Sequence, residues 1–421
     1  MKRIISCVAV VVLALTAIPS AQAAFVIGGE NGWQLSTDGI VDIFGHYRST
    51  SQAPDAASHP LGLLGNNDQN FGVTVGLLPS VIAFNVKAPT VNGVESTVRV
   101  GIYPSVQNKS QTSRLDTSPN IDFRELFYTA KGKYGEFLAG RALNLYQGKN
   151  ILTDMTLLTV GVVPGSVGST TLGHIAYGYL YTNFGPQFRY TTPDLNGVKV
   201  AVSIAEPYSI SADTAKTNVP RIETEISYAT VFGGGNTFQS WVSGLFQTDT
   251  RSTAAGTPRP GGHNKSLGGA AGVEVGFKGV DLLASGYCGE GLGMVSTQDG
   301  DLTAVTKAAG AGAVRGLTSV DSAGNERTHW GFLAQATYKL TPAVKIGANY
   351  GQTRQEKTDA DKAGALPFVL KKKQEAAVAM VTYNFNAFTQ FIAEYTYAQD
   401  TWHDGATNHS NAISVGTMFY W

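Results

Sequence analysis

Apolar and polar residues alternate with a period of two along most of this chain. In the run Ser96–Tyr103, Val98, Val100 and Ile102 share one side of the pattern, and the residues between them are polar, small or aromatic. The same alternation recurs in residues 81–87, 222–228, 273–278, 330–339 and 390–397. Successive side chains of a β-strand point to opposite faces, so the pattern predicts strands, whereas helical periodicity is scarce.

The connections between the predicted strands alternate in length. Short turns are predicted at residues 91–93, 133–135, 194–197, 233–236, 279–280, 341–342 and 386–387. Long polar loops fall between them, at residues 50–69, 109–120, 208–221, 250–264, 293–327, 356–373 and 401–408. Short turns at one end and long loops at the other are typical of a transmembrane, antiparallel, up-and-down β-barrel, here of about sixteen strands. The predicted fold class is therefore all-β.

Two soluble β folds, in a secreted protein, are the alternatives. A β-helix would show a short internal repeat, and the sequence contains none. A large sandwich would not need aromatic residues near so many strand ends, whereas a membrane barrel places such rings at its two interfaces. The recurring aromatic positions are Trp330, Tyr338, Tyr350, Tyr383, Phe385, Tyr395, Tyr397 and Phe419.

Residues 1–23 have the pattern of a secretory signal peptide. Lys2 and Arg3 precede an apolar run over residues 4–18, and Ala21 to Ala23 match the small-x-small cleavage pattern. The apolar run is too short to span a bilayer as a helix. We therefore expect cleavage after Ala23, export, and one folded domain over residues 24–421.

Composition favours a membrane barrel over other classes. Charged residues make up 15% of the chain, against about 25% in soluble proteins, and 49 of the 421 residues are glycine. Basic and acidic residues number 31 each, so no basic excess points to a nucleic-acid partner. Two cysteines, Cys7 and Cys288, are too few for a disulfide scaffold. No HExxH, CxxC or P-loop motif occurs, and we expect neither a metal nor a cofactor.

Four segments resemble the Gram-negative porin family. Residues Phe123–Arg141 contain an arginine-led strand, a tight turn ending in Tyr-Gly and a strand ending in Gly-Arg. Residues Arg189–Gly197 resemble the family's Tyr-x-x-Pro-x-x-x-Gly turn, and Gly39–Asp42 is similar to its first strand. Residues Ile413–Trp421 alternate and close on an aromatic residue, although phenylalanine is the commoner last residue in that family.

The resemblance implies a sixteen-stranded barrel in the outer membrane of a Gram-negative bacterium, usually a homotrimer, that passes small hydrophilic solutes by diffusion. It implies that residues 142–172 fold inward as a constriction loop; an ordinary external loop is the alternative. It also implies that Phe419 and Trp421 belong to a signal read by the outer-membrane assembly machinery. The lipid bilayer and lipopolysaccharide are the partners expected at the outer surface.

The alternation places several cations in the predicted lumen, because a cation on the lipid face costs about 2–4 kcal/mol at the bilayer midplane. They are Arg48, Lys87, Arg99, Arg124 and Arg141. The predicted constriction loop adds Lys149 and Asp154 and is otherwise neutral, although porins often carry several acids there. Since lining charge biases ion flow, we predict a mildly anion-preferring pore.

A second interpretation is that these arginines pair with Asp42, Asp122 or Glu125 and stabilise the wall without setting selectivity. Glu125 raises a separate question, because the phase that turns Arg124 inward turns Glu125 toward lipid. We hypothesise that a subunit interface among the early strands covers Glu125, since the porin family trimerises around them.

Two other functions stay open as alternatives. A hydrolase needs a nucleophile backed by a histidine, and His409-Ser410-Asn411 only partly resembles the site of the phospholipase barrel, so we predict no enzyme. A substrate-specific channel would show the same strand pattern as a general porin, and nothing in the sequence names a solute.

Overall fold

Most of the chain folds into one antiparallel sheet. The computed structural model describes residues 25–108, 121–166, 170–297, 318–364 and 366–421, and the predicted signal peptide lies outside them. The strands are β1 (Phe25–Gly28), β2 (Gln34–Thr50), β3 (Gln69–Thr74), β4 (Val81–Lys87), β5 (Glu95–Pro104), β6 (Ile121–Gly132), β7 (Gly135–Leu143), β8 (Phe184–Thr191), β9 (Val198–Ala205), β10 (Thr214–Lys216), β11 (Arg221–Phe232), β12 (Asn236–Arg251), β13 (His263–Phe277), β14 (Val280–Glu290), β15 (Thr328–Lys339), β16 (Val344–Gln355), β17 (Lys371–Asn384), β18 (Thr389–Trp402) and β19 (Thr407–Tyr420).

Helix is sparse in the described ranges. The helices are α1 (Gly148–Leu152), the 3-10 helix η2 (Met155–Leu158) and α3 (Asp359–Lys362). None of the helices in these ranges has the length and apolar character needed to cross a membrane.

The sheet closes on itself as a barrel. β2 pairs with β19 on one side and with β3 and β4 on the other, so the first and last barrel strands are joined. β3 and β4 together form one barrel strand, interrupted at residues 75–80, while β1 and β10 are short additions to β2 and β12. β9 pairs with β11, and the other strands pair in sequence order. Counted in this way, the described residues form sixteen barrel strands, which confirms the predicted fold class.

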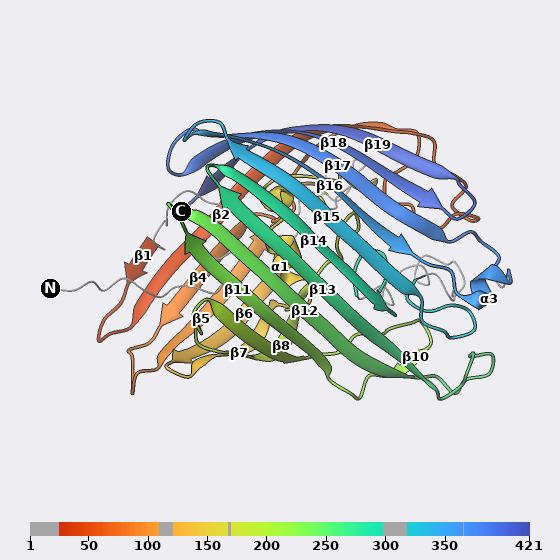
Figure 1. The fold of residues 1–421 in the computed structure, drawn as a ribbon, viewed down its shortest axis with the longest axis horizontal. Helices are drawn as coiled ribbons and strands as arrows, with labels where there is room; N and C mark the ends of the chain where they lie inside the picture. The colour runs from red at the N-terminus through yellow and green to blue at the C-terminus, as the bar shows by residue number, and fades with distance from the viewer. Residues whose placement is uncertain (1–24, 109–120, 167–169, 298–317, 365) are drawn as a thin grey trace.

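The two ends of the barrel differ in their connections. At one end, turns as short as residues 133–134 and 278–279 join the strands, and the last strand ends there at the C-terminus. At the other end the connections are long, for example residues 51–68, 206–220 and 356–370. Figure 1 shows β10 and α3, which belong to these long connections, at the end opposite the C-terminus.

The outward face of the sheet is apolar and aromatic. Leu126 and Phe188 are 58% and 62% exposed because they point away from the lumen. The predicted interface aromatics Tyr338, Tyr383 and Phe419 are also exposed. An apolar outer band flanked by aromatic rings is what a membrane-spanning barrel requires.

A bulge in β6 changes the predicted side of Glu125. The register between β5 and β6 shifts so that Phe123 pairs with Ile102 and Glu125 with Gly101, which leaves Arg124 as the extra residue. Glu125 therefore lies on the lumen side and not toward lipid as predicted. Its carboxylate accepts hydrogen bonds from Arg99 Nε and from the Tyr103 hydroxyl, both at 2.8 Å. A subunit interface is not needed to account for this acid.

Arg141 lies on the outward side of β7, whereas the sequence analysis predicted that it faces the lumen. It pairs across the sheet with the exposed Leu126 on β6 and with Pro186 on β8. The prediction relied on the cost of a charge at the bilayer midplane, but β7 ends only two residues later, at Leu143. Near the interface that cost falls to about 0–1 kcal/mol, and a long side chain reaches polar surroundings.

The chain end is attached to the first barrel strand. Gly39 and Trp421 exchange two backbone hydrogen bonds of 3.2 Å. The indole ring covers Gly39, so that a Cβ at this position would lie 2.5 Å from the ring and 2.5 Å from the Val81 carbonyl oxygen. Phe419 lies beside it, with ring centroids 6.4 Å apart. The close approach of the indole and the Val81 carbonyl therefore requires glycine at position 39.

Replacing Gly39 with alanine is expected to destabilise the closed barrel. The added methyl group meets a backbone carbonyl that cannot move without breaking the β2–β4 pairing, and such overpacking costs about 1–3 kcal/mol. The measurement is the temperature at which the compact folded band converts to the unfolded band on a gel. Gly269→Ala is the matched control, because nothing lies within 4 Å of a Cβ at that position. Equal transition temperatures for the two variants would contradict the prediction.

Candidate functional site

The described residues of the connection between β7 and β8, 144–166 and 170–183, run through the lumen of the barrel. We call this connection the inward segment. It extends further toward the C-terminus than the predicted constriction loop, residues 142–172, because β8 begins only at Phe184. In Figure 1 its yellow trace, with α1, is seen within the ring of strands.

Apolar side chains pack the inward segment against most of the barrel wall. A first cluster joins Ile151 and Leu157 to lumen-facing residues of β12, β14, β15, β17 and β18. A second joins Val160 to β2, β4, β5, β18 and β19, and a third joins Tyr146 to β12, β13 and β14. The inward segment is rich in leucine and valine because it forms a hydrophobic core with the wall.

Two wall carboxylates accept hydrogen bonds from the backbone of the inward segment. Glu223 on β11, which is fully buried, accepts from the N–H groups of Leu145 and Tyr146 at 2.7 and 3.0 Å. Glu394 on β18 accepts from the Gly161 N–H and the Thr159 hydroxyl, at 2.6 and 2.5 Å. Buried N–H groups need partners, and these carboxylates supply them on two different parts of the wall.

Two wall amides anchor the middle of the inward segment. Gln335 on β15 accepts from the Met155 N–H at 2.6 Å and donates to the Thr153 carbonyl at 3.2 Å. Asn349 on β16 donates to Asp154 at 3.2 Å, and its carbonyl oxygen lies 2.7 Å from His174 Nε2. The inward segment is therefore hydrogen-bonded to the wall in β11, β15, β16 and β18.

Asp154 lies at the centre of the inward segment and not at its surface. Only 3% of the residue is exposed. Its carboxylate accepts from the Thr156 N–H at 2.9 Å and from the Tyr179 hydroxyl at 2.7 Å. Burial raises the pKa of Tyr179 well above its ordinary value, so its hydroxyl keeps the proton that it donates to Asp154. The geometry therefore gives this predicted pore acid the position of an internal anchor.

Lys149, the other predicted charge of the loop, is partly exposed and faces acids of the wall. It lies close enough to Glu225 on β11 and Glu274 on β13 for electrostatic interaction. The side chains of these two acids belong to the lumen face. Lys149 therefore contributes to the electrostatic field of the lumen beside β11 and β13.

The predicted wall cations are paired to different degrees. Arg99 donates to Asp38 at 2.8 and 3.0 Å and to Glu125 at 2.8 Å, so two carboxylates neutralise it. Arg124 donates to Asp122 at 2.8 Å, and the Asp122 side chain is 57% exposed. An ion pair with an exposed partner is weakened by water and salt.

The remaining predicted cations lie near the barrel ends. Lys87 pairs with Glu95 at 2.6 Å beside a short turn. Arg48 is buried, with Nη2 at 2.5 Å from Asp68, and it also donates to the Pro164 carbonyl of the inward segment. Arg48 thus links the first long loop to the inward segment.

The pairing hypothesis is supported for two of the three acids. Asp122 pairs with Arg124, and Glu125 with Arg99. Asp42 instead accepts from the Gly76 N–H at 2.6 Å and from the Ser80 hydroxyl at 2.8 Å. It stabilises the interruption between β3 and β4.

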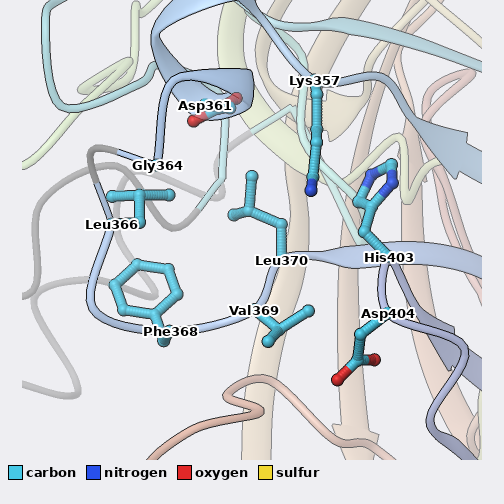
Figure 2. Close-up of a pocket in the computed structure, with 9 residues that line it drawn as sticks. All are labelled: Lys357, Asp361, Gly364, Leu366, Phe368, Val369, Leu370, His403 and Asp404. Atoms are coloured by element: carbon cyan, nitrogen blue, oxygen red, sulfur yellow. The ribbon is translucent and has the colours of Figure 1, made fainter.

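A hollow between the outer loops lies outside the lumen. Figure 2 shows Leu366 and Phe368 on one side of it, with His403 and Asp404 on the other. Lys357 points into the space between them.

A hydrogen-bonded chain of Ser58, His59 and Asp404 lies beside this hollow. Ser58 Oγ is 3.0 Å from His59 Nδ1, and His59 Nε2 is 2.8 Å from Asp404 Oδ2. The Ser58 hydroxyl also lies 2.9 Å from the Asp55 carboxylate, which competes for its single proton. The chain therefore links two outer loops and does not have the geometry of an activated nucleophile.

The hydrolase hypothesis from the sequence also lacks its geometry. Ser410 is 3% exposed and faces the lumen, whereas His409 lies on the outward face and stacks on Tyr397 with centroids 6.1 Å apart. The two side chains point to opposite sides of β19 and cannot act on one another.

The family model described as Gram-negative porin matches residues 9–420. The chain belongs to the Gram-negative porin family. Together with the closed barrel, this makes the protein an outer-membrane channel for passive diffusion. No curated protein sequence matches this porin significantly.

Solved outer-membrane proteins share the fold of this porin at low sequence identity. The outer membrane channel DcaP of Acinetobacter baumannii has a TM-score of 0.63 and 14% identity, over 95% of this chain and 100% of that one. An anion-selective porin from Comamonas acidovorans has a TM-score of 0.60 and 12% identity, over 92% and 100%. The trimer form of OmpT from Vibrio cholerae has a TM-score of 0.51 and 12% identity, over 93% and 100%.

Sequence reasoning missed the wall residues that anchor the inward segment. Glu223, Gln335 and Glu394 lie in alternating runs that predicted strands and no further role, and Asn349 lies in none of these runs. Their signal is weak, because a lumen-facing acid that anchors a loop and one that lines water occupy the same phase of a strand. Only the path of residues 144–183 distinguishes them.

Replacing Glu394 with alanine is expected to loosen the inward segment. The Gly161 N–H loses its acceptor, and a buried unsatisfied N–H costs about 1–3 kcal/mol. Single-channel recordings should show larger and noisier open-state currents than the wild type. Glu394→Gln keeps one acceptor oxygen, so its open-channel current should be almost as low in noise as that of the wild type.

Glu274→Ala is the control for this experiment. Glu274 also faces the lumen, but its hydrogen-bond partner is Gln239 on the neighbouring strand. Removing its charge should change selectivity without adding current noise. Equal noise in Glu274→Ala and Glu394→Ala would show that the anchor at Glu394 does not restrain the segment.

Proposed function

We propose that this porin passes small hydrophilic solutes by size-limited diffusion with a mild preference for anions. The inward segment is the observation that supports it. This segment narrows the lumen by packing on β12 to β15, on β17 to β19 and on the first strands, while charged side chains line the lumen faces of β5 and β6. A narrowed, charged, water-filled passage selects solutes by size and by charge.

The preference is expected to be mild because most lumen charges are paired. Arg99 has two carboxylate partners, and Lys149 faces two acids. Arg124 is the best-placed cation for a passing anion, since its partner is exposed to water. The porin from Comamonas acidovorans that shares this fold is anion-selective, which agrees with this direction.

Reversal potentials in a salt gradient test the charge preference. The wild-type channel is expected to favour chloride over potassium, and Arg124→Gln should shift the reversal potential toward equal permeability, because a lumen cation is removed. Arg141→Gln is the matched control, since it removes the same charge from the outward face and should leave the reversal potential unchanged. A cation-preferring wild-type channel would refute the proposal.

A substrate-specific channel is the alternative. It is favoured by half-buried apolar residues at the inward segment, including Leu152, Leu158 and Leu172. Liposome swelling with a graded series of neutral sugars separates the two functions. A diffusion porin should sort the sugars by size alone, whereas a specific channel should show one solute that enters faster than its size predicts.

We also propose that the porin is a homotrimer. The outward-facing Arg141 donates to the Phe184 carbonyl at 2.7 Å and is otherwise exposed on an apolar wall. A neighbouring subunit on the early strands would cover it. The trimer form of the OmpT structure gives a precedent within the fold.

We propose that lipopolysaccharide binds the outward rim at the ends of β15 to β17. Arg354 pairs across the sheet with Trp330 on one side and with Lys373 on the other. The Arg354 guanidinium lies 5.1 Å from the Trp330 ring centroid. Lys373 also pairs with Glu375 at 2.6 Å, so the two cations leave one unbalanced positive charge beside the aromatic ring. At the long-loop end this charge suits a phosphate group of the outer leaflet.

Neutralising this rim should weaken lipopolysaccharide binding. With about 1 kcal/mol per cation, the double variant R354Q/K373Q should bind roughly 30-fold more weakly in a titration of detergent-solubilised protein. The control is K339Q/K345Q, because Lys339 and Lys345 also pair across the sheet but lie at the opposite end of the barrel, on the lumen side with Asp281 and Glu274. Equal losses in both double variants would refute a site at the outer rim.

Export and assembly complete the proposal. We propose that residues 1–23 direct export and are removed. The last strand ends in Phe419, exposed on the outward face, and Trp421, which packs on Gly39. In an unfolded chain both rings would be accessible to the assembly machinery, and closure of the barrel places one of them against the first strand.

A further inference from the structure

One part of the wall lies outside the apolar contacts that pack the inward segment. In the described residues, the buried cluster on β6 and β7 contains Phe127, Leu138 and Ala142, and no residue of the inward segment joins it. The other four buried clusters each contain residues of the inward segment and join it to most of the remaining wall. The apolar contacts of the inward segment therefore leave the side formed by β6 and β7, next to Tyr103 on β5, for a solute that crosses the barrel.

Aromatic rings gather at the outer part of this side. The rings of Tyr103 on β5 and Phe184 on β8 lie 6.1 Å apart at an angle of 56°. Tyr181, near the end of the inward segment, is close enough to Arg124 and Asp122 to interact with their charges. Burial raises the pKa of Tyr181, so its hydroxyl is neutral in the physiological range. Phe184 and Tyr181 are partly exposed, which leaves ring surface for a solute.

The guanidinium of Arg124 places a positive charge beside these rings. Its guanidinium carbon lies 5.5 Å from the centroid of the Tyr103 ring. In the described part of the chain its ion pair is with Asp122, through Nε, so the two terminal amino groups of the guanidinium remain for an anion. Arg99, on the same side, cannot serve in this way because Asp38 and Glu125 occupy it.

The surface beside Tyr103 is apolar. Leu78 and Leu158 are half-buried and pack against the cluster that contains Tyr103. A hydrophilic anion such as chloride gains nothing from these leucines or from the rings. A solute with a carboxylate at one end and a planar ring at the other would use the guanidinium and the apolar surface together.

We propose that Arg124, Tyr103, Phe184 and Tyr181 form a binding subsite for small aromatic carboxylates in the outer part of the channel. This inference rests on the proposed diffusion function and adds a solute class to it. The carboxylate would pair with the terminal nitrogens of Arg124, and the ring would lie against Phe184 and Tyr181. The subsite gives a bias within a diffusion pore, because one guanidinium and a few partly exposed rings bind weakly and release readily.

Planar-bilayer recordings of the full protein test the subsite. Benzoate is the probe, with acetate as the anion without a ring and benzamide as the ring without a charge. Benzoate should reduce the chloride current in a saturable manner, whereas acetate and benzamide should change it only in proportion to concentration. Arg124→Gln should raise the half-blocking benzoate concentration roughly tenfold, the ratio that corresponds to losing one charged hydrogen-bond pair.

Two further variants separate the subsite from general effects. Phe184→Leu removes ring surface and should weaken the benzoate block without changing the ion preference, while Lys133→Gln, which removes an exposed cation from the short turn between β6 and β7, should change neither. Equal block by acetate and benzoate, or an unchanged block in Arg124→Gln, would overturn the subsite. A wild-type protein that shows no ionic conductance at all would instead refute the diffusion function on which the subsite depends.

Discussion

Hydrogen bonding of a buried polypeptide backbone is the constraint on which this channel depends. The inward segment leaves the sheet at Leu143 and returns at Phe184, so it cannot use the barrel ladder for its N–H and C=O groups. Wall side chains replace the ladder: Glu223 and Glu394 accept from backbone amides, and Gln335 both accepts and donates. Without these partners the segment would stay in water outside the barrel, because unpaired buried backbone groups are costly.

The same constraint explains the distribution of charge. A wall acid that accepts two hydrogen bonds from the inward segment is not available to attract cations from the lumen, and Asp154 is enclosed by its own loop. The lumen acids that remain are largely matched by Arg99 and Lys149. The described acids of the lumen therefore fall into two arrangements, anchoring contacts to the inward segment and short-range pairs along the passage.

Much of the fold could be predicted because its signal is local. Alternation identifies a strand from a few residues, and turn residues separate one strand from the next, so the strand count needed no knowledge of contacts. The predicted orientation of a single charged side chain was wrong where the strand departs from regular alternation or where the residue lies far from the bilayer midplane. Glu125 follows a bulge that adds one residue to β6, and Arg141 lies so near the end of β7 that its outward position is tolerated. The anchoring roles of Asp154 and Glu394 depend on contacts with distant residues, which no local pattern records.

The sequence by itself determined the all-β barrel, the number of its strands, the ends that carry short and long connections, and the apolar outer face. Each of these follows from side-chain periodicity and turn chemistry within about ten residues. Only the tertiary structure decided which lumen charges are engaged and which remain for a solute. That distinction depends on where the inward segment crosses the barrel and on which wall groups it contacts. Two side chains that both face the lumen can therefore differ, one being engaged by a partner and the other remaining available to a solute. Arg99 and Arg124 lie on adjacent strands and both face the lumen. Arg99 is enclosed by two carboxylates, whereas Arg124 pairs with one carboxylate that is exposed to water.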